Sequence, residues 1–501
     1  MGDHCEHCIE PLPQDHRFAA PEWQQWPYNL IYQSFLLNQQ WWHNATTGAQ
    51  GVTGHHEQLV TFAVRQMLDM FSPSNFLLTN PEVLSATVKS GGTSLLQGAQ
   101  NRFEDAMRLA TGQPVPGTEK FRPGHEVAVT PGKVVFRNHL IELIQYTPQT
   151  ETVFAEPVLI VPSWILKFYI LDLSPSNSLV RHLVEKGHTV FMVSWKNPDS
   201  GDRNLGMDDY LKAGVMAAID AVASIVPKRQ IQAVGYCLGG TLLSMAAAFM
   251  ARSHDDRLNS LTLLASELDF TEPGELGLFI DESQLAFLDD MMSGKGYLDG
   301  KQMAGAFALL NSCDLVWSRM EHDYLLGQHQ PVNDLAAWNA DATRMPYRQH
   351  SEYLHSLYLK NDLAEGRYLV DGKPIALSDI RVPVFSLGTQ RDTVSPWRSV
   401  YKVNLLTKAE VTFCLTSGGH NVGIVNPPGP GVKRSYQLAT RGADDHYIDP
   451  VRGRPRHPRS RARGGPHGRL GCSSTLASAP PRPRWGTRPI RRLKMRRAAT
   501  S

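Results

Sequence analysis

The chain of 501 residues is predicted to contain a large α/β domain built on a mainly parallel sheet, and three observations predict it. Apolar segments of strand length alternate with segments of helical periodicity through the middle of the chain. A cysteine flanked by glycines stands between one such strand and one such helix, in the segment GYCLG at residues 235–239. An aspartate and a histidine follow later strands, where open α/β sheets place their functional groups.

Residues 1–130 have mostly helical periodicity, and they are predicted to form a helical region that precedes the sheet. Within it, Trp41, Trp42 and residues 76–78 are interpreted as core or interface positions rather than substrate contacts. Near the start, Cys5 and Cys8 stand beside two histidines, a composition that can recruit a metal ion. No second Cys/His pair follows at ligand spacing, so we predict no metal site.

Residues 131–450 are predicted to form the catalytic domain, because strands that alternate with helices imply parallel strands joined by right-handed crossovers. Each strand is indicated by a short apolar run and each helix by a longer amphipathic one. The predicted strands are 158–161, 189–194, 231–234, 261–265, 382–388 and 411–416, and the predicted helices are 177–186, 208–225 and 241–250.

Residues 267–376 show no obvious strand of this sheet and are rich in Leu, Met, Phe, Trp and Tyr. They fall where folds of this class insert a cap, so we expect this segment to cover the site. For most of its individual aromatic residues, ordinary core packing is the better interpretation.

The segment at 235–239 has the form G-x-nucleophile-x-G, with cysteine in the position of the nucleophile. A sharp turn from strand to helix requires small neighbours, and Gly235, Gly239 and Gly240 supply them. The helix that follows directs free N–H groups and its positive dipole end at the sulfur, which favours the thiolate. Cys237 is therefore the predicted nucleophile, and a buried, inert cysteine is the alternative.

Asp392 and His420 follow Cys237 in the order nucleophile, acid, histidine that the α/β-hydrolase fold uses. Each stands just after a predicted strand. We therefore predict a Cys237, Asp392, His420 triad on an α/β-hydrolase fold with a cap insertion and a helical N-terminal region. Taken singly, Asp392 could equally be a surface carboxylate and His420 a loop histidine without a role.

Residues 451–501 contain 15 Arg or Lys and no Asp or Glu, whereas the preceding residues carry 35 basic and 48 acidic side chains. The tail is rich in Pro, Gly, Ala and Ser without apolar periodicity, so we predict that it is disordered. A basic arm for nucleic acid or an anionic surface is one interpretation. We prefer a GC-rich gene read in a shifted frame, and we expect no nucleic-acid partner unless the basic tail is a genuine arm.

The composition favours a cytoplasmic enzyme. Six scattered cysteines do not form a disulfide framework. The sequence shows neither a signal peptide nor an uncharged apolar run of membrane-spanning length.

Further segments resemble the polyhydroxyalkanoate synthases, which polymerise 3-hydroxyacyl-CoA into a storage polyester. The resemblance covers about residues 15–450 and includes the segments 72–81, 164–173, 194–199, 314–317, 338–344, 419–420 and 425–428. The segment GYCLGGT at 235–241 is most similar to members that prefer short-chain substrates and act without a second type of subunit.

The resemblance implies an acyltransferase that carries the acyl group as a thioester on Cys237 and releases CoA. His420 would be the base, and Asp392 would either orient His420 or activate the incoming 3-hydroxyl group. The backbone N–H groups of Leu238 and Ile165 would form the oxyanion hole. The CoA thioester is then a substrate, no cofactor is implied, and a homodimer on the surface of polyester granules is expected.

The chain departs from the family pattern at two site positions. The family typically has histidine where Thr393 follows the aspartate, and isoleucine where Asn421 follows the histidine. The basic tail also stands where the resemblance implies a tryptophan-rich C-terminal helix. The N-terminal region is shorter than in many members of the family, which suggests that the N-terminus is truncated.

The sequence is also compatible with two other functions. One is a cysteine hydrolase of the same fold, similar to dienelactone hydrolases or to a thioesterase, whose product would be a free acid. The other is an inactive homologue damaged by its tail.

Overall fold

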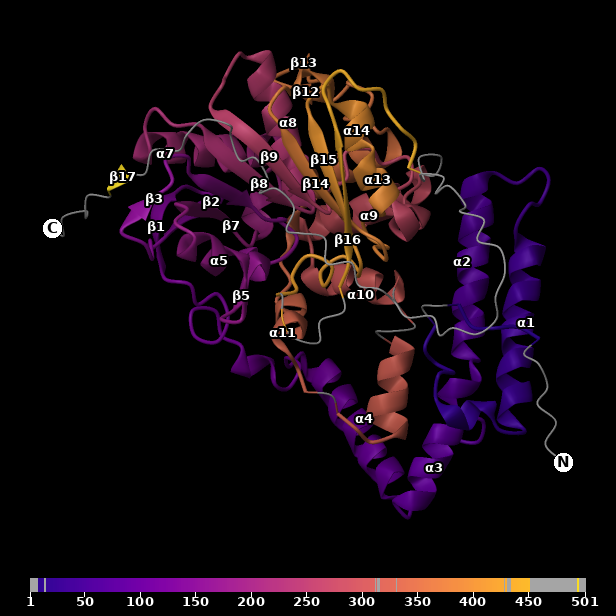
Figure 1. Cartoon of the computed structure of the whole chain (residues 1–501). Helices are drawn as coiled ribbons and strands as arrows, with labels where there is room; N and C mark the ends of the chain where they lie inside the picture. The colour runs from indigo at the N-terminus through magenta and orange to yellow at the C-terminus, as the bar shows by residue number, and fades with distance from the viewer. Residues whose placement is uncertain are drawn as a thin grey trace, which may run out of the picture.

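The computed structural model describes residues 8–12, 15–310, 312, 316–329, 331–427, 429, 434–450 and 493–494. Its centre is a nine-stranded sheet with the strand order β1-β2-β7-β4-β8-β9-β14-β15-β16 (Figure 1). The six strands from β7 to β15 are parallel, and the pairs β1–β2, β2–β7 and β15–β16 are antiparallel. The predicted α/β class with a mainly parallel sheet is confirmed.

Each strand predicted from the sequence lies in this sheet. The strands are β1 (Gly132–Arg137), β2 (Ile141–Tyr146), β4 (Val158–Val161), β7 (Val190–Trp195), β8 (Ile231–Tyr236), β9 (Leu258–Leu264), β14 (Val384–Thr389), β15 (Val411–Thr416) and β16 (Tyr436–Arg441). The strands β1, β2 and β16 were not predicted. The edge strands β1 and β16 are largely exposed and lack a buried apolar run. The inner strand β2 buries Ile141, Leu143 and Tyr146, a pattern that could have indicated it.

The other strands form two-stranded pairs outside the sheet. They are β3 (Thr152–Val153) with β17 (Leu493–Lys494), β5 (Asp172–Ser174) with β6 (Asn177–Ser178), β10 (Tyr297–Leu298) with β11 (Met345–Pro346), and β12 (Leu369–Val370) with β13 (Lys373–Pro374).

The helices of the sheet domain follow the predicted alternation. They are α5 (Leu179–Glu185), α6 (Met207–Asp209), α7 (Ala217–Ile225), α8 (Leu238–Arg252), α13 (Trp397–Tyr401) and α14 (Val403–Leu406). A π-helical stretch joins α6 to α7, which accounts for the single helix predicted over 208–225. The helix predicted from residue 177 begins later, because Ser178 caps α5 by accepting the N–H of Arg181.

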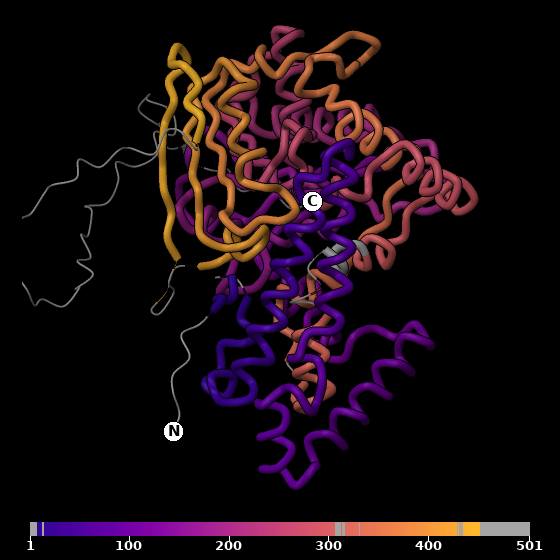
Figure 2. Tube along the Cα trace, turned by 90° about the vertical axis from the view of Figure 1, so that its right-hand side faces the viewer, coloured from indigo at the N-terminus to yellow at the C-terminus, as the bar shows by residue number. Residues whose placement is uncertain are grey.

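The N-terminal region consists of α1 (Tyr28–Thr46), α2 (Gly54–Met70), α3 (Pro81–Lys89) and α4 (Thr93–Thr111). Helices α1 and α2 lie side by side, beside the sheet domain, and α3 and α4 form the far end (Figures 1 and 2). A small separate core holds Phe18, Trp23, Tyr32 and Leu36. Trp41 and Trp42 are 61% and 38% exposed, so the core interpretation of this pair was wrong, and the interface interpretation stays a prediction.

Residues 267–376 contribute no strand to the nine-stranded sheet in the part of this segment that the structure describes. Their helices are α9 (Glu282–Lys295), α10 (Gly300–Leu310), α11 (Asp334–Ala340) and α12 (Tyr347–Tyr353), with π-helical stretches at Met320–Leu325 and Leu354–Leu359. The first of these stretches packs on α4, where Gly98 approaches the Tyr324 carbonyl closely. This segment therefore connects the N-terminal helices to the sheet domain.

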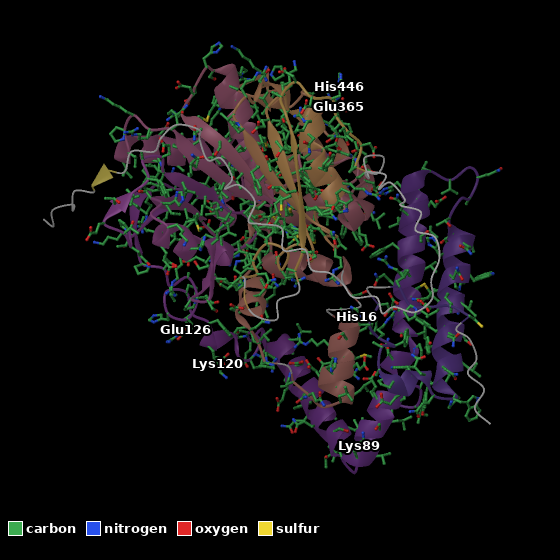
Figure 3. The ribbon with its side chains drawn as sticks, in the orientation of Figure 1. His16, Lys89, Lys120, Glu126, Glu365 and His446 are labelled. Carbon is green, nitrogen blue, oxygen red and sulfur yellow. The ribbon has the colours of Figure 1, made fainter. Side chains whose placement is uncertain are left out.

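Figure 3 shows Lys89, from α3 of the N-terminal region, at one end of the molecule and Glu365 and His446 at the other end. Among the described helices, none has both the length and the apolar character that a membrane span requires. The predictions for Cys5 and for residues 451–492 and 495–501 fall outside the described residues. Residues 493–494 are described and pair with β3, so the prediction of disorder was wrong for these two residues.

Candidate active site

Cys237 occupies the sharp turn between β8 and α8, as predicted. Its backbone lies at φ +52° and ψ −127°, in a region that residues other than glycine rarely adopt. Its N–H donates to the Leu264 carbonyl at 2.8 Å, which anchors the turn to the neighbouring strand β9. Such a strained turn, held by its surroundings, presents the side chain at the carboxyl edge of the sheet.

The glycines of the elbow are required by close packing. A Cβ atom on Gly235 would collide with the Cα of Gly240, and one on Gly239 would collide with the carbonyl oxygens of Val161 and Pro162. The start of α8 therefore lies directly against the loop that follows β4.

Asp392 lies in the loop after β14, where it is fully buried and hydrogen-bonded. Its Oδ1 accepts the backbone N–H groups of Val394 at 2.9 Å and Ser395 at 2.8 Å. Its Oδ2 accepts from the Thr389 hydroxyl at 3.2 Å and lies 2.8 Å from His420 Nδ1. These four bonds fix the carboxylate and leave it aimed at the imidazole.

His420 follows β15, and its ring stands between Asp392 and Cys237. Burial disfavours the charged imidazole, but the negative charges of Asp392 and of a Cys237 thiolate outweigh it, and hydrogen bonds to both groups add to their effect. The pKa of His420 is therefore raised well above its ordinary value. Since Nδ1 faces Asp392, the other ring nitrogen is left to serve Cys237.

The two candidate oxyanion donors come from adjacent elements. Leu238 is the first residue of α8, where a backbone N–H has no acceptor within the helix. Ile165 follows β4, which pairs with β8, so its loop adjoins the elbow. The Ile165 N–H lies 3.5 Å from the Ser163 hydroxyl, a long hydrogen bond. The oxyanion roles of both residues stay predictions.

Residues from the predicted cap hold the loop after β4 in place. The Trp338 indole donates to the Lys167 carbonyl at 2.8 Å, and the Thr343 hydroxyl donates to the Trp164 carbonyl at 2.8 Å. The Tyr353 ring meets the Trp164 ring edge to face at 5.8 Å. Cys237 itself is only 7% exposed, so its side chain is shielded from bulk water.

A buried acid that the sequence analysis missed lies beside the triad. Glu267 follows β9, and no described residue forms a hydrogen bond with its buried Oε1. Burial, then the charges of Asp392 and Cys237, raise the pKa of Glu267 well above its ordinary value, against weaker opposing effects of His420 and Lys402. A polar residue just past the end of a central strand was the signal that could have indicated it.

Within the described residues, no group of three or more His, Cys, Asp or Glu side chains is arranged to hold a metal ion. The chemistry that this geometry supports is nucleophilic transfer through sulfur, with an imidazole base held by a carboxylate.

Comparisons with known proteins concern the fold and the family of the chain. Residues 14–183 match the family profile described as "Poly-beta-hydroxybutyrate polymerase (PhaC) N-terminus", and residues 156–427 match the profile described as "alpha/beta hydrolase fold". The α/β-hydrolase fold predicted from the order of the triad is thereby confirmed.

Three curated relatives are similar over most of their length. The poly(3-hydroxyalkanoate) polymerase of Methylorubrum extorquens is 42% identical over 92% of this chain and 76% of its own. Polymerase subunits of Rhizobium meliloti and Cupriavidus necator are 37% and 38% identical, over 89% and 84% of this chain and 73% and 72% of theirs. The chain therefore belongs to the poly(3-hydroxyalkanoate) polymerase family.

Proposed function

We propose that this protein polymerises (R)-3-hydroxyacyl-CoA into polyhydroxyalkanoate, with release of CoA, through a thioester on Cys237. The observation that carries the proposal is the array of Cys237, His420 and Asp392 beneath a buried cover, in a chain of this family. The same array would serve a hydrolase, but the family membership does not favour that alternative.

The first step loads the enzyme. His420 accepts the thiol proton of Cys237, and the sulfur attacks the thioester carbonyl of the substrate. The N–H groups of Leu238 and Ile165 stabilise the oxyanion, and the C–S bond to CoA breaks as His420 returns the proton to the departing thiolate. One thioester replaces another, so the step is close to thermoneutral.

The second step forms the ester. The 3-hydroxyl of another substrate, or of a chain end, attacks the acyl carbonyl on Cys237 while His420 takes its proton. The carbon–sulfur bond breaks and the proton returns to Cys237. Asp392 holds the ring of His420 in both steps, which the 2.8 Å bond to Nδ1 supports over direct action on the hydroxyl.

The enzyme forms polymer rather than free acid only if water is excluded from the site. A thioester that meets water hydrolyses, so the acyl group on Cys237 must be sheltered until the hydroxyl arrives. The slight exposure of Cys237 beneath the 267–376 segment supports this part of the proposal.

We further propose that the N-terminal helices meet the polyester granule and contribute to a homodimer. Large apolar side chains are exposed along these helices, at Leu30, Leu37, Trp41, Trp42, Val60, Met67, Leu96 and Phe103. An apolar surface of this extent on one region is typical of an interaction site.

The purified chain should release CoA from 3-hydroxybutyryl-CoA and leave a polyester of high molecular weight. The substrate is short because the elbow segment resembles members that prefer short chains. The assay measures free thiol, and the acyl product is recovered and sized. Free 3-hydroxybutyrate as the main product would establish the hydrolase instead, and no thiol release would indicate an inactive homologue.

A further inference from the structure

We propose that Tyr236 and Asn421 form a positioning pair that sets the distance between the nucleophile and its base. Tyr236 immediately precedes Cys237, and Asn421 immediately follows His420. The Tyr236 hydroxyl donates to Asn421 Oδ1 at 2.6 Å. This inference rests on the catalytic roles of Cys237 and His420 proposed above.

The bond joins two segments that are otherwise held by different parts of the sheet. The elbow is anchored to β9 through the Cys237 N–H. The histidine loop is fixed by its own turns, in which the Asn421 carbonyl accepts the N–H groups of Ile424 and Val425 at 3.0 and 2.8 Å. β9 and β14 lie between β8 and β15 in the sheet. The hydrogen bond therefore joins directly two loops that follow strands which are not neighbours.

The surroundings of Tyr236 make the link stiff. Its ring is buried and lies 5.9 Å from the His420 ring, at an interplanar angle of 56°. Burial, with the charges of Cys237 and Asp392, raises its pKa well above the ordinary value, so the phenol keeps the proton that it donates. A buried hydroxyl that lost its acceptor would have to move or remain unpaired, at a substantial cost.

The family resemblance implies an isoleucine at the position of Asn421. An isoleucine side chain cannot accept a hydrogen bond, whereas asparagine can. The pair acts through His420 and does not touch the reacting atoms.

The test compares Tyr236→Phe, Asn421→Leu and the double variant in the full-length protein. Leucine matches asparagine in branching and size but provides no acceptor. Each single variant should lower kcat for CoA release by roughly tenfold with little change in KM. The double variant should be no slower than Asn421→Leu alone, because the bond is lost only once and no hydroxyl is left unpaired.

A second readout does not depend on any substrate. Iodoacetamide alkylates Cys237, and the mass of the peptide that contains Cys237 reports the rate. The pH profile of this rate should shift to higher pH in both single variants. Tyr146→Phe is the matched control, because the Tyr146 hydroxyl is also buried but lies against Met192 in β7, away from the triad. This control should leave kcat and the alkylation profile unchanged.

Two results would overturn the proposal. One is single variants with wild-type kcat and alkylation profiles, and the other is losses that multiply in the double variant. The alkylation readout separates this outcome from failure of the polymerase proposal, since it needs no acyl-CoA.

Discussion

At the scale of single residues, the chemistry depends on a few buried charges near one sulfur. Asp392 is held by four hydrogen bonds, and its position makes the imidazolium of His420 favourable despite burial. Cys414 provides a contrast within the same chain. Burial alone raises the pKa of Cys414 to about 11, and that thiol stays protonated and inert.

Replacement of Cys237 by alanine should lower CoA release by on the order of 10⁴-fold or more, because it removes the atom that carries the acyl group. Cys414→Ala is the control, and it should retain wild-type turnover since its thiol takes no part. Thiol release from 3-hydroxybutyryl-CoA measures both. Appreciable turnover in Cys237→Ala would exclude the covalent mechanism.

Asp392→Asn should slow the first release of CoA as well as the later transfer to a hydroxyl, because the base needs an oriented ring in both steps. Rapid mixing with 3-hydroxybutyryl-CoA separates the initial release from steady turnover. A normal first release with slow elongation would instead assign Asp392 to activation of the hydroxyl.

Glu267 should make the protein less stable as the pH rises. The pKa of Glu267 in the folded state lies above the ordinary 4.5. At pH values between 4.5 and this raised pKa, the folded chain holds a proton that the unfolded chain has lost. The free energy of unfolding then falls by up to ~1.4 kcal/mol per pH unit in that window. Glu267→Gln removes this dependence.

The measurement is the melting temperature of both proteins at several pH values from about 5 upward. The melting temperature of Glu267→Gln minus that of the wild-type protein should increase with pH until the pH reaches the raised pKa of Glu267. A constant difference across this range would show that Glu267 is ionised, or paired, in the folded protein. The charged and polar groups that act on it are Asp392, Cys237, His420, Lys402, Tyr353 and Tyr358.

At the scale of elements, the elbow works because a helix and a loop approach each other without side chains between them. Gly239→Ala should destabilise the protein by about 1–3 kcal/mol and lower activity, since its Cβ would meet backbone carbonyls that cannot move away. Gly294→Ala in α9 is the control. No atom of the described residues lies within 4 Å of its added Cβ, and the variant should be neutral or stabilising by about 0.5–1 kcal/mol.

Thermal unfolding compares the two alanine variants, and CoA release shows whether the elbow still functions. Equal melting temperatures and equal rates for both variants would mean that the close packing at Gly239 is not required.

The sequence predicted the central elements well because their signals are local. Apolar runs such as 158–161 and 411–416 are strands with the same bounds in the structure. The strand at 158–161 is buried along its whole length and therefore reads as a continuous apolar run. The edge strands β1 and β16 escaped notice because exposed residues carry no such signal. The partners of Glu267 and Tyr236 depend on which loops meet at the sheet edge, which only the fold determines.

At the scale of the whole molecule, two regions with different surfaces are joined through the 267–376 segment. The sheet domain has a continuous core, whereas the N-terminal helices have a small one and expose many apolar side chains. Replacement of Trp41 and Trp42 by serine should lower the fraction of protein that sediments with polyester granules, and CoA release from dissolved substrate should persist. Unchanged sedimentation would place granule binding elsewhere.

The tail offers a further test at this scale. Apart from the short pairing of β17 with β3, the described contacts of the sheet domain extend to Ile448, whose carbonyl accepts from the Tyr401 hydroxyl at 3.0 Å. A chain that ends at residue 450 should therefore keep CoA release. If residues 451–501 are a genuine basic arm, the full chain should bind DNA with an affinity that falls steeply as salt rises, and the shortened chain should not.

The central claim is that Cys237 carries the growing acyl chain. The most direct measurement is the mass of the peptide that contains Cys237 after brief mixing of the protein with 3-hydroxybutyryl-CoA and an acid quench. We expect a population in which this peptide is heavier by one or more 3-hydroxybutyryl units, with the Cys414 peptide unmodified. Polymer formation with no acyl group on the Cys237 peptide at any time would contradict it.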